Sequence, residues 1–144
     1  MKVKIKRFDK SLPLPVYKTA GAAALDLASR EEMTVNPGEI VYLPLNVALQ
    51  VPADSFVLVA ARSSLHKRGL MLINGIGIGD SDYCGSDDEY RAAVYNFSKE
   101  PVVVKKGERI SQMIVLRREK VEWEEVAEFS KEKNRGGFGS TGKH

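Results

Sequence analysis

The chain has 144 residues, 43% of them hydrophobic and 28% charged, a balance typical of one globular domain with a single sizeable core. The formal net charge is +3, and acids and bases are interspersed, so we expect no direct nucleic-acid binding. The apolar runs are far shorter than the roughly 20 residues that cross a membrane, so we expect no membrane association. The only cysteine, Cys84, excludes an intrachain disulfide, and we expect a cytoplasmic protein.

Short runs of β-branched and aromatic residues predict strands along most of the chain. In the first, Val3 and Ile5 alternate with lysines, which is typical of a half-buried strand. Further runs cover residues 40–43, 47–51, 56–60, 91–97, 102–104, 110–116 and 121–126. Proline and glycine separate several of these runs, and only residues 63–68 predict a helical turn. The pattern indicates an all-β fold of the jelly-roll or β-sandwich class with one short helix.

Residues 1–130 are expected to form this one domain, and residues 131–144 a flexible tail. The tail is polar and rich in glycine, so we expect it to be mobile when nothing is bound. Its Gly, Ser and Thr residues offer backbone N–H groups that can surround an anion. Phe138 lies among the glycines as an aromatic ring suited to stacking on a base. A glycine-rich end with no binding role is the alternative.

The stretch Ala61-Arg62-Ser63-Ser64-Leu65 follows a predicted strand and opens the predicted helical turn. Backbone N–H groups at a helix start, two hydroxyl groups and a guanidinium group form a good phosphate-binding set. The plain alternative is that one of the two serines only caps the helix.

The sequence leaves open the role of two acidic features, Asp26 and the stretch of residues 79–90. Asp26 is the only charge in the apolar run of residues 19–27, and a buried acid is costly unless it is paired, so it is either a structural turn residue or a functional acid. Residues 79–90, GDSDYCGSDDEY, hold five carboxylates within a basic chain, and like charges this close repel. A solvated acidic turn is the plain interpretation, and a site that uses one of the acids is the alternative.

Taken together and in this order, five stretches of the chain resemble the motifs of the trimeric dUTP diphosphatase family. They are TAGAAALDLAS at 19–29, ARSSL at 61–65, NGIGIGDSDYCG at 74–85, GERISQMI at 107–114 and RGGFGSTG at 135–142. The resemblance implies a jelly-roll subunit and a homotrimer with active sites at the subunit interfaces. It also implies Mg²⁺-assisted cleavage of dUTP to dUMP and pyrophosphate, which keeps uracil out of DNA and supplies dUMP for dTMP synthesis.

The resemblance assigns the nucleoside-binding and catalytic roles by position in the third motif. Asp80 resembles the general base that activates water for attack on the α-phosphorus. Asn74 and the backbone near Gly77 resemble the hairpin that binds uracil. Tyr83 resembles the residue beneath the deoxyribose that leaves no room for a 2′-hydroxyl group. We expect the other acids of this stretch to support the turn or to be solvated, namely Asp82 for the turn and Asp87, Asp88 and Glu89 for solvent.

The other motifs are similar to the parts of the family that hold the triphosphate and the metal. The phosphate-holding set would be Arg62, Ser63, Ser64 and Gln112, and Asp26 would meet the Mg²⁺ ion through water. In the tail, Phe138 resembles the aromatic residue that closes over uracil. The tail residues that resemble phosphate-binding ones are Gly139, Ser140 and Thr141, with Arg135 or Lys133 as the cation that meets the γ-phosphate.

Two other functions on the same fold are weighed against this one. A dCTP deaminase would need a glutamate on the strand after the third motif, and residues 91–96 there, RAAVYN, contain no acid. A non-catalytic nucleotide-sensing regulatory protein would have no need of a catalytic base, whereas Asp80 and the complete tail are present. Both features favour the diphosphatase.

Overall fold

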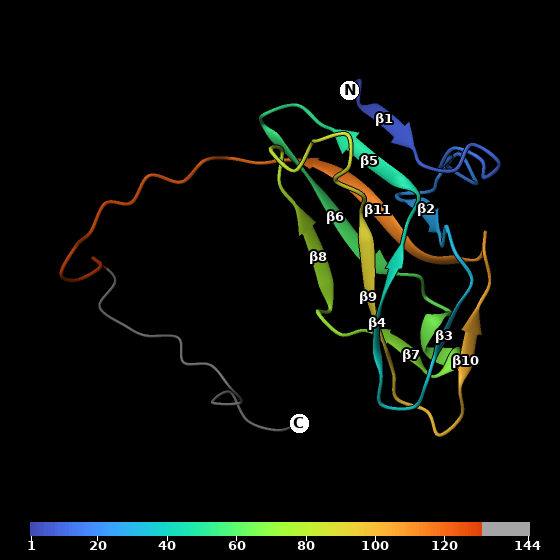
Figure 1. Ribbon diagram of the computed structural model, residues 1–144. Coiled ribbons are helices and arrows are strands. Elements are labelled where there is room, and N and C mark those ends of the chain that lie inside the picture. The colour runs from blue at the N-terminus through green and yellow to red at the C-terminus, as the bar shows by residue number, and fades with distance from the viewer. Residues whose placement is uncertain (131–144) are drawn as a thin grey trace.

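The computed structural model describes residues 1–130, and the expected tail at 131–144 lies outside the described residues. Strands make up nearly all of the regular structure (Figure 1). They are β1 (Lys4–Arg7), β2 (Leu25–Ala28), β3 (Met33–Val35), β4 (Ile40–Pro44), β5 (Val47–Gln50), β6 (Ser55–Ala61), β7 (Leu70–Leu72), β8 (Ile76–Gly79), β9 (Arg91–Asn96), β10 (Val102–Val104) and β11 (Arg109–Arg117). Within these residues one short 3₁₀ helix, η1 (Leu65–Arg68), interrupts the strands.

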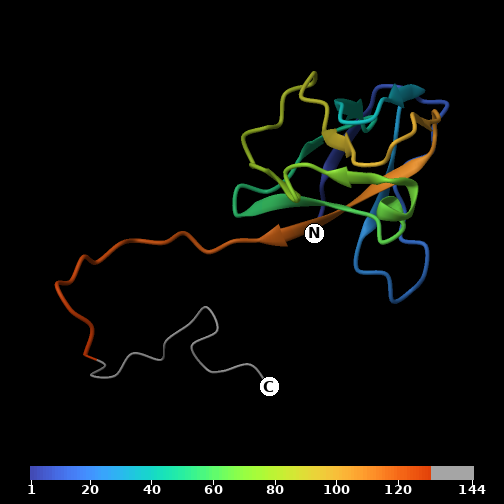
Figure 2. The same cartoon turned by 90° about the horizontal axis from the view of Figure 1, so that it is seen from below.

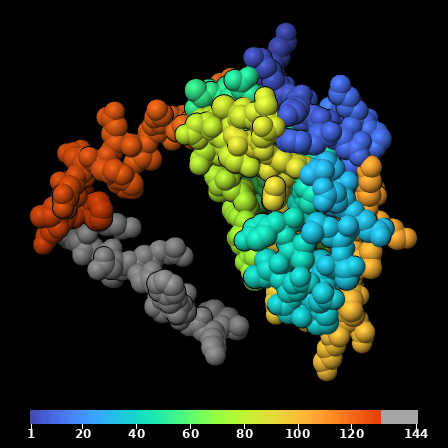
Figure 3. Space-filling view, viewed as in Figure 1, coloured from blue at the N-terminus to red at the C-terminus, as the bar shows by residue number. Residues whose placement is uncertain are grey.

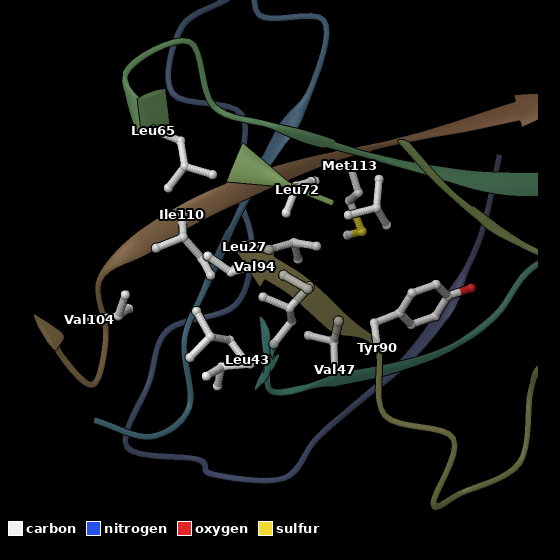
Figure 4. Packing of buried hydrophobic residues seen from close by; sticks show 14 of the residues in the cluster. Leu27, Leu43, Val47, Leu65, Leu72, Tyr90, Val94, Val104, Ile110 and Met113 are labelled. Carbon is white, nitrogen blue, oxygen red and sulfur yellow. The ribbon is translucent and has the colours of Figure 1, made fainter. Parts of the chain in front are cut away.

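Two antiparallel sheets enclose the core. One has the strand order β2-β11-β6-β8 and the other the order β4-β9-β7, while β1 pairs with β5 and β10 with β3. Side chains alternate between the faces of each strand, so that Val57 on β6 and Val94 on β9 are both fully buried. The inward side chains of both sheets meet in one apolar cluster (Figure 4). The predicted all-β class, a jelly roll or β-sandwich, is confirmed.

The predicted helical turn is confirmed at η1. It ends at Gly69, whose φ of 75° lies in the left-handed region that favours glycine. A Cβ atom at this position would also lie 2.5 Å from the Cβ of Ser98, so the turn has no room for a side chain. The segment before η1 is held at the end of β6 by the backbone N–H of Arg62, which donates to the carbonyl of Ile110 at 3.3 Å. No helix within residues 1–130 is long and apolar enough to cross a membrane.

The predicted strand at 121–126 is wrong. After β11 the chain leaves the sheets, and residues 118–130 form an extended arm (Figures 1 and 2). The space-filling view in Figure 3 shows this arm, in orange to red, projecting from the body of the molecule. The alternation of Val121 and Trp123 with acids resembles a strand, but a strand needs a neighbour to pair with, and within the described chain the arm has none.

Candidate active site

The hairpin between β7 and β8 presents backbone to a cavity. Gly75, with a φ of 70°, turns the chain after Leu72, and β8 then pairs with the edge of β6. Gly77 and Gly79 lie on the inward face of β8, opposite the buried Val59 and Val57. Gly77 has no side chain to cover the neighbouring peptide groups, which suits recognition of a planar ligand through the backbone, whereas Gly79 is buried against Tyr90.

One cavity of about 440 Å³ brings together four residues that the sequence predicts for the site. They are Asn74, Gly77, Asp80 and Tyr83. Asp80 follows β8 directly and is exposed, and its carboxylate makes no ion pair within residues 1–130. The side chains that line the cavity are both apolar and polar, and its volume suits a small-molecule ligand.

Glu89 contradicts the prediction that the end of the acidic stretch is solvated. The residue is only 5% exposed, and its two carboxylate oxygens accept hydrogen bonds from Arg30 at 2.8 and 3.0 Å. The backbone N–H of Asn46 donates a third bond of 2.9 Å. The hydrogen bonds to Glu89 raise the pKa of the Arg30 guanidinium. A bidentate partner of opposite charge therefore allows this acid to be buried.

The other acids of the turn have different roles. Asp88 was predicted to be solvated, but it is half-buried and accepts a hydrogen bond of 2.7 Å from the backbone N–H of Gly85, so it supports the turn itself. Asp82 was predicted to do this, but it is exposed and makes no side-chain hydrogen bond within residues 1–130. Asp87 is solvated as predicted, with only an exposed ion pair to Lys6 at 3.3 Å. Three acids of the turn, Asp87, Asp88 and Glu89, therefore have partners that offset the repulsion, although the ion pair of Asp87 is exposed.

Two of the predicted phosphate-holding residues, Arg62 and Gln112, lie beside Asp26. Its carboxylate, whose side chain is 16% exposed, pairs with Arg62 at 3.0 Å and with Arg109 at 2.8 Å. Gln112 lies opposite Asp26 in the register of β2 and β11, and its side-chain N–H donates to the carbonyl of Ala61 at 3.0 Å. Asp26 lies on strand β2 rather than in a turn, and it is paired with two guanidinium groups; its role as a functional acid stays a prediction.

Arg109 was not predicted as a site residue. It lies in the GERISQMI stretch at the start of β11, and its role follows from the pairing of β11 with β2. The only signal in the sequence was that Arg109 lies in the same motif as the predicted phosphate-binding Gln112.

Ser63 and Ser64 are exposed and directly precede η1. Ser64 occupies the N-cap position by backbone geometry, but its side chain makes no capping hydrogen bond. Ser64 is therefore an N-cap by position, as the alternative predicted, but its hydroxyl group is not used for capping within residues 1–130. The remaining predicted site residues lie outside the described residues: Lys133, Arg135, Phe138, Gly139, Ser140 and Thr141.

The two halves of the predicted site lie at opposite ends of β6. Gly79, which precedes Asp80, pairs with Val57, whereas Arg62 comes directly after the last residue of the strand. At about 3.3 Å per residue, the five residues from Val57 to Arg62 span about 17 Å. The cavity that contains Asp80 and the hollow lined by Arg62 and Ser64 share no lining residue. Within one chain, therefore, Asp80 and Arg62 do not meet.

The fold and these two clusters define a β-sandwich protein with a cavity of nucleoside size and a separate basic cluster suited to phosphate. The family model for dUTPase matches residues 10–142. The chain is 42% identical to the deoxyuridine 5′-triphosphate nucleotidohydrolase of Dictyoglomus turgidum over 148 residues, 99% of each chain. It is 46% identical to that of Desulfitobacterium hafniense over 150 residues, 99% of this chain and 97% of the relative. The chain belongs to the dUTPase family.

Solved structures agree with this assignment. The crystal structure of dUTPase from Streptococcus mutans superposes with a TM-score of 0.75 at 28% identity, covering 83% of this chain and 98% of that one. A mutant dUTPase of Staphylococcus bacteriophage 80alpha, solved with dUpNHpp, gives a TM-score of 0.81 at 22% identity and covers 99% of both chains. The superposition on the bacteriophage enzyme extends the agreement in fold to almost the whole chain.

Proposed function

We propose that this protein hydrolyses dUTP to dUMP and pyrophosphate in the cytoplasm, and so keeps uracil out of DNA while supplying dUMP for dTMP synthesis. The names of its curated relatives support this substrate. The single observation that carries the proposal is the cavity in which Asn74, Asp80 and Tyr83 lie together. Asn74 and the open backbone at Gly77 would bind uracil, and Tyr83 would lie beneath the deoxyribose.

Asp80 is the general base in this proposal. Its exposed carboxylate has no ion-pair partner within residues 1–130, so it can accept a proton. A water molecule held by Asp80 gives up that proton as its oxygen bonds to the α-phosphorus, and the bond from the α-phosphorus to the bridging oxygen breaks. Pyrophosphate leaves with the electron pair of that bond. The carboxylate therefore has to lie within hydrogen-bond reach of the attacking water.

Arg62, Ser63, Ser64 and Gln112 would hold the triphosphate. Asp26 keeps the Arg62 side chain oriented, and Arg109 shares the Asp26 carboxylate, so the cluster is arranged before the ligand arrives. Ordered positive charge of this kind stabilises the negative charge that develops on a leaving pyrophosphate. The substrate's phosphates would therefore meet residues that are already in place.

The donor set fits Mg²⁺ carried by the substrate. Both oxygens of Asp26 are engaged by arginines, so this residue would meet the ion through water, while phosphate oxygens supply direct ligands. The bound ion would neutralise charge on the phosphates. A structural Mg(II) ion is described for the dUTPase of phage phi11 of S. aureus, which shares this fold.

We also propose that the protein acts as a homotrimer. The separation of Asp80 from Arg62 means that a complete site needs a second copy of the chain. The outer face of the β6–β8 pair is apolar, with Leu58 opposite Ile78, which is 56% exposed. The arm exposes Trp123 and Phe129 at 91% and 85%. Large exposed apolar surfaces of this kind mark contacts between proteins.

The tail completes the proposed site. Phe138 would cover the uracil, and the backbone N–H groups of Gly139, Ser140 and Thr141 would contact the phosphates. A cation at Arg135 or at Lys133 would meet the γ-phosphate, and substituting each by alanine separately would distinguish the two.

Pyrophosphate release measured side by side with dUTP, UTP, dTTP and dCTP, with and without Mg²⁺, tests the proposed function. We expect dUTP to be strongly preferred and the rate to depend on Mg²⁺. Release of ammonia from dCTP would instead support a deaminase. Binding of dUTP without any turnover would support a nucleotide-sensing protein.

A further inference from the structure

Position 79 needs a glycine because the ring of Tyr90 leaves no room for a side chain there, not because the backbone needs a glycine conformation. The residue is buried at the end of β8, and a Cβ atom built on it would lie 2.2 Å from the hydroxyl oxygen of Tyr90. The same Cβ atom would lie 2.5 Å from Cε1 and 2.7 Å from Cζ of that ring. The Tyr90 ring therefore occupies the space that a side chain at position 79 would fill.

The position of the Tyr90 ring is set by its backbone and its burial. The backbone N–H of Tyr90 donates to Val47 at 2.9 Å, and its carbonyl accepts from Leu45 at 2.9 Å. Only 7% of the residue is exposed, and its hydroxyl group points away from the labelled core side chains Val47 and Val94 (Figure 4). The ring thus extends from the core to the wall of the cavity that contains Asp80.

Tyr90 contacts the residue predicted to lie beneath the sugar. The rings of Tyr83 and Tyr90 meet edge to face, with centroids 5.4 Å apart and planes at 88°. At its other end, the Tyr83 hydroxyl donates to the carbonyl of Glu89 at 3.0 Å. Tyr83 is otherwise 41% exposed, so these two contacts are what hold its ring at the cavity. Glu89 is itself fixed by Arg30 and Asn46.

We propose that Tyr90 is a positioning residue that sets the sugar specificity of this site, because its ring, accommodated by Gly79, holds Tyr83 where a ribose 2′-hydroxyl group would collide with it. The inference rests on the proposed function and adds a determinant beyond the residues that touch the nucleotide. Without the Tyr90 ring, Tyr83 loses its edge-to-face contact and can rotate about its side-chain bonds. The room that opens beneath the sugar then admits ribose.

Steady-state kinetics of Tyr90→Val with dUTP and UTP test the inference. The preference for dUTP over UTP in kcat/KM should fall by about tenfold, the upper scale of one lost aromatic pair. The lower preference should come mainly from changes in KM for dUTP and for UTP, and kcat for dUTP should change little. Tyr90→Phe keeps the ring and should keep the preference. Tyr95→Val, on β9, which begins directly after Tyr90, lies outside the cavity lining and is the matched control.

A double substitution tests the link between the two positions. Gly79→Ala alone should displace the Tyr90 ring and lower the same preference. In a Tyr90→Val background the space is free, so adding Gly79→Ala should change the preference little, and the two effects should not add. An unchanged preference in Tyr90→Val and in Gly79→Ala, or additive effects, would overturn the inference.

Calorimetric binding of dUMP and UMP separates this inference from the proposed function. If the wild-type protein fails to hydrolyse dUTP, the proposed function is wrong. A weaker preference for dUMP in Tyr90→Val would then still support the role of Tyr90 in sugar discrimination, and an unchanged preference would reject it.

Discussion

Asp80 and Glu89 belong to the same turn, yet only Asp80 has a side chain open to solvent. The difference lies in their partners, because Glu89 has a bidentate arginine and a backbone N–H, whereas Asp80 has neither. An acid fully occupied by strong donors cannot readily accept a proton. At the scale of single residues, this difference in partners supports the role of base that is proposed for Asp80.

Asp80→Asn should preserve the fold and the binding of dUMP but lower kcat for dUTP by about 10²-fold or more, the scale of a lost general base. The amide has nearly the same shape as the carboxylate but accepts no proton. Rapid-quench kinetics and calorimetry would measure the two properties. Asp82→Asn, in the same turn and also exposed, is the control and should retain turnover. Near-normal turnover of Asp80→Asn would reject the assignment.

Tyr90 should make stability sensitive to alkaline pH. Burial raises its pKa from about 10 to about 12, so the folded state holds the phenol proton more tightly than the unfolded state does. This stabilisation is fully present below pH 10 and is lost as the pH rises towards 12. In denaturant unfolding at fixed protein concentration, the free energy of unfolding should fall more steeply with pH for the wild type than for Tyr90→Phe. The difference in slope should be up to about 1.4 kcal/mol per pH unit. Identical slopes would contradict the raised pKa.

Residue types and local patterns predicted much of the fold, but they did not predict long-range pairing. The alternation in residues 56–60 and 110–116 is a local property, and both strands are present in the structure. The burial of Glu89 depends on Arg30, which is 59 positions away in sequence. The role of Arg109 depends on Asp26, 83 positions away. Such partners become visible only when the sheets are assembled.

At the scale of elements, β8 serves two surfaces at once. Gly77 and Gly79 face inward, and Ile76 and Ile78, which also line the cavity, are exposed beside β6. The alternation of side chains along a strand makes both possible, so a strand at the sheet edge can shape a ligand site and an intermolecular surface together. The predicted strand at 121–126 failed for a related reason, since the apolar residues of the arm have no partner strand within the described chain.

Deleting residues 131–144 should leave the body folded and nearly abolish dUTP hydrolysis. The core cluster of the described chain ends at Val115, and residues 117–130, which join it to this segment, are exposed, so we expect the unfolding temperature to change little. The lost contacts would be those proposed to cover uracil and the phosphates. Differential scanning calorimetry and pyrophosphate release would measure the two effects. Hydrolysis at the full-length rate would show that the tail has no part in the site.

At the scale of the whole molecule, the apolar outer face of β6 and β8 should control assembly. We expect the wild-type protein to be a trimer of 15.9 kDa chains, about 48 kDa by light scattering. Ile78→Lys places a charge in this face, and burying an unpaired charge is costly, so the trimer should dissociate and activity should fall. Thr34→Lys, exposed on β3, is the control and should stay trimeric. An active wild-type monomer would reject the assembly.

The distance along β6 between the cavity and the basic cluster has a genetic consequence. If each site takes Asp80 from one chain and Arg62 from another, two separately inactive proteins can rescue each other. Asp80→Asn and Arg62→Ala, mixed in equal amounts and refolded together, would form mixed trimers in which one site of three has both intact residues. Random assembly would then restore about a quarter of wild-type activity, since about three quarters of the trimers are mixed. Mixing without subunit exchange should restore none.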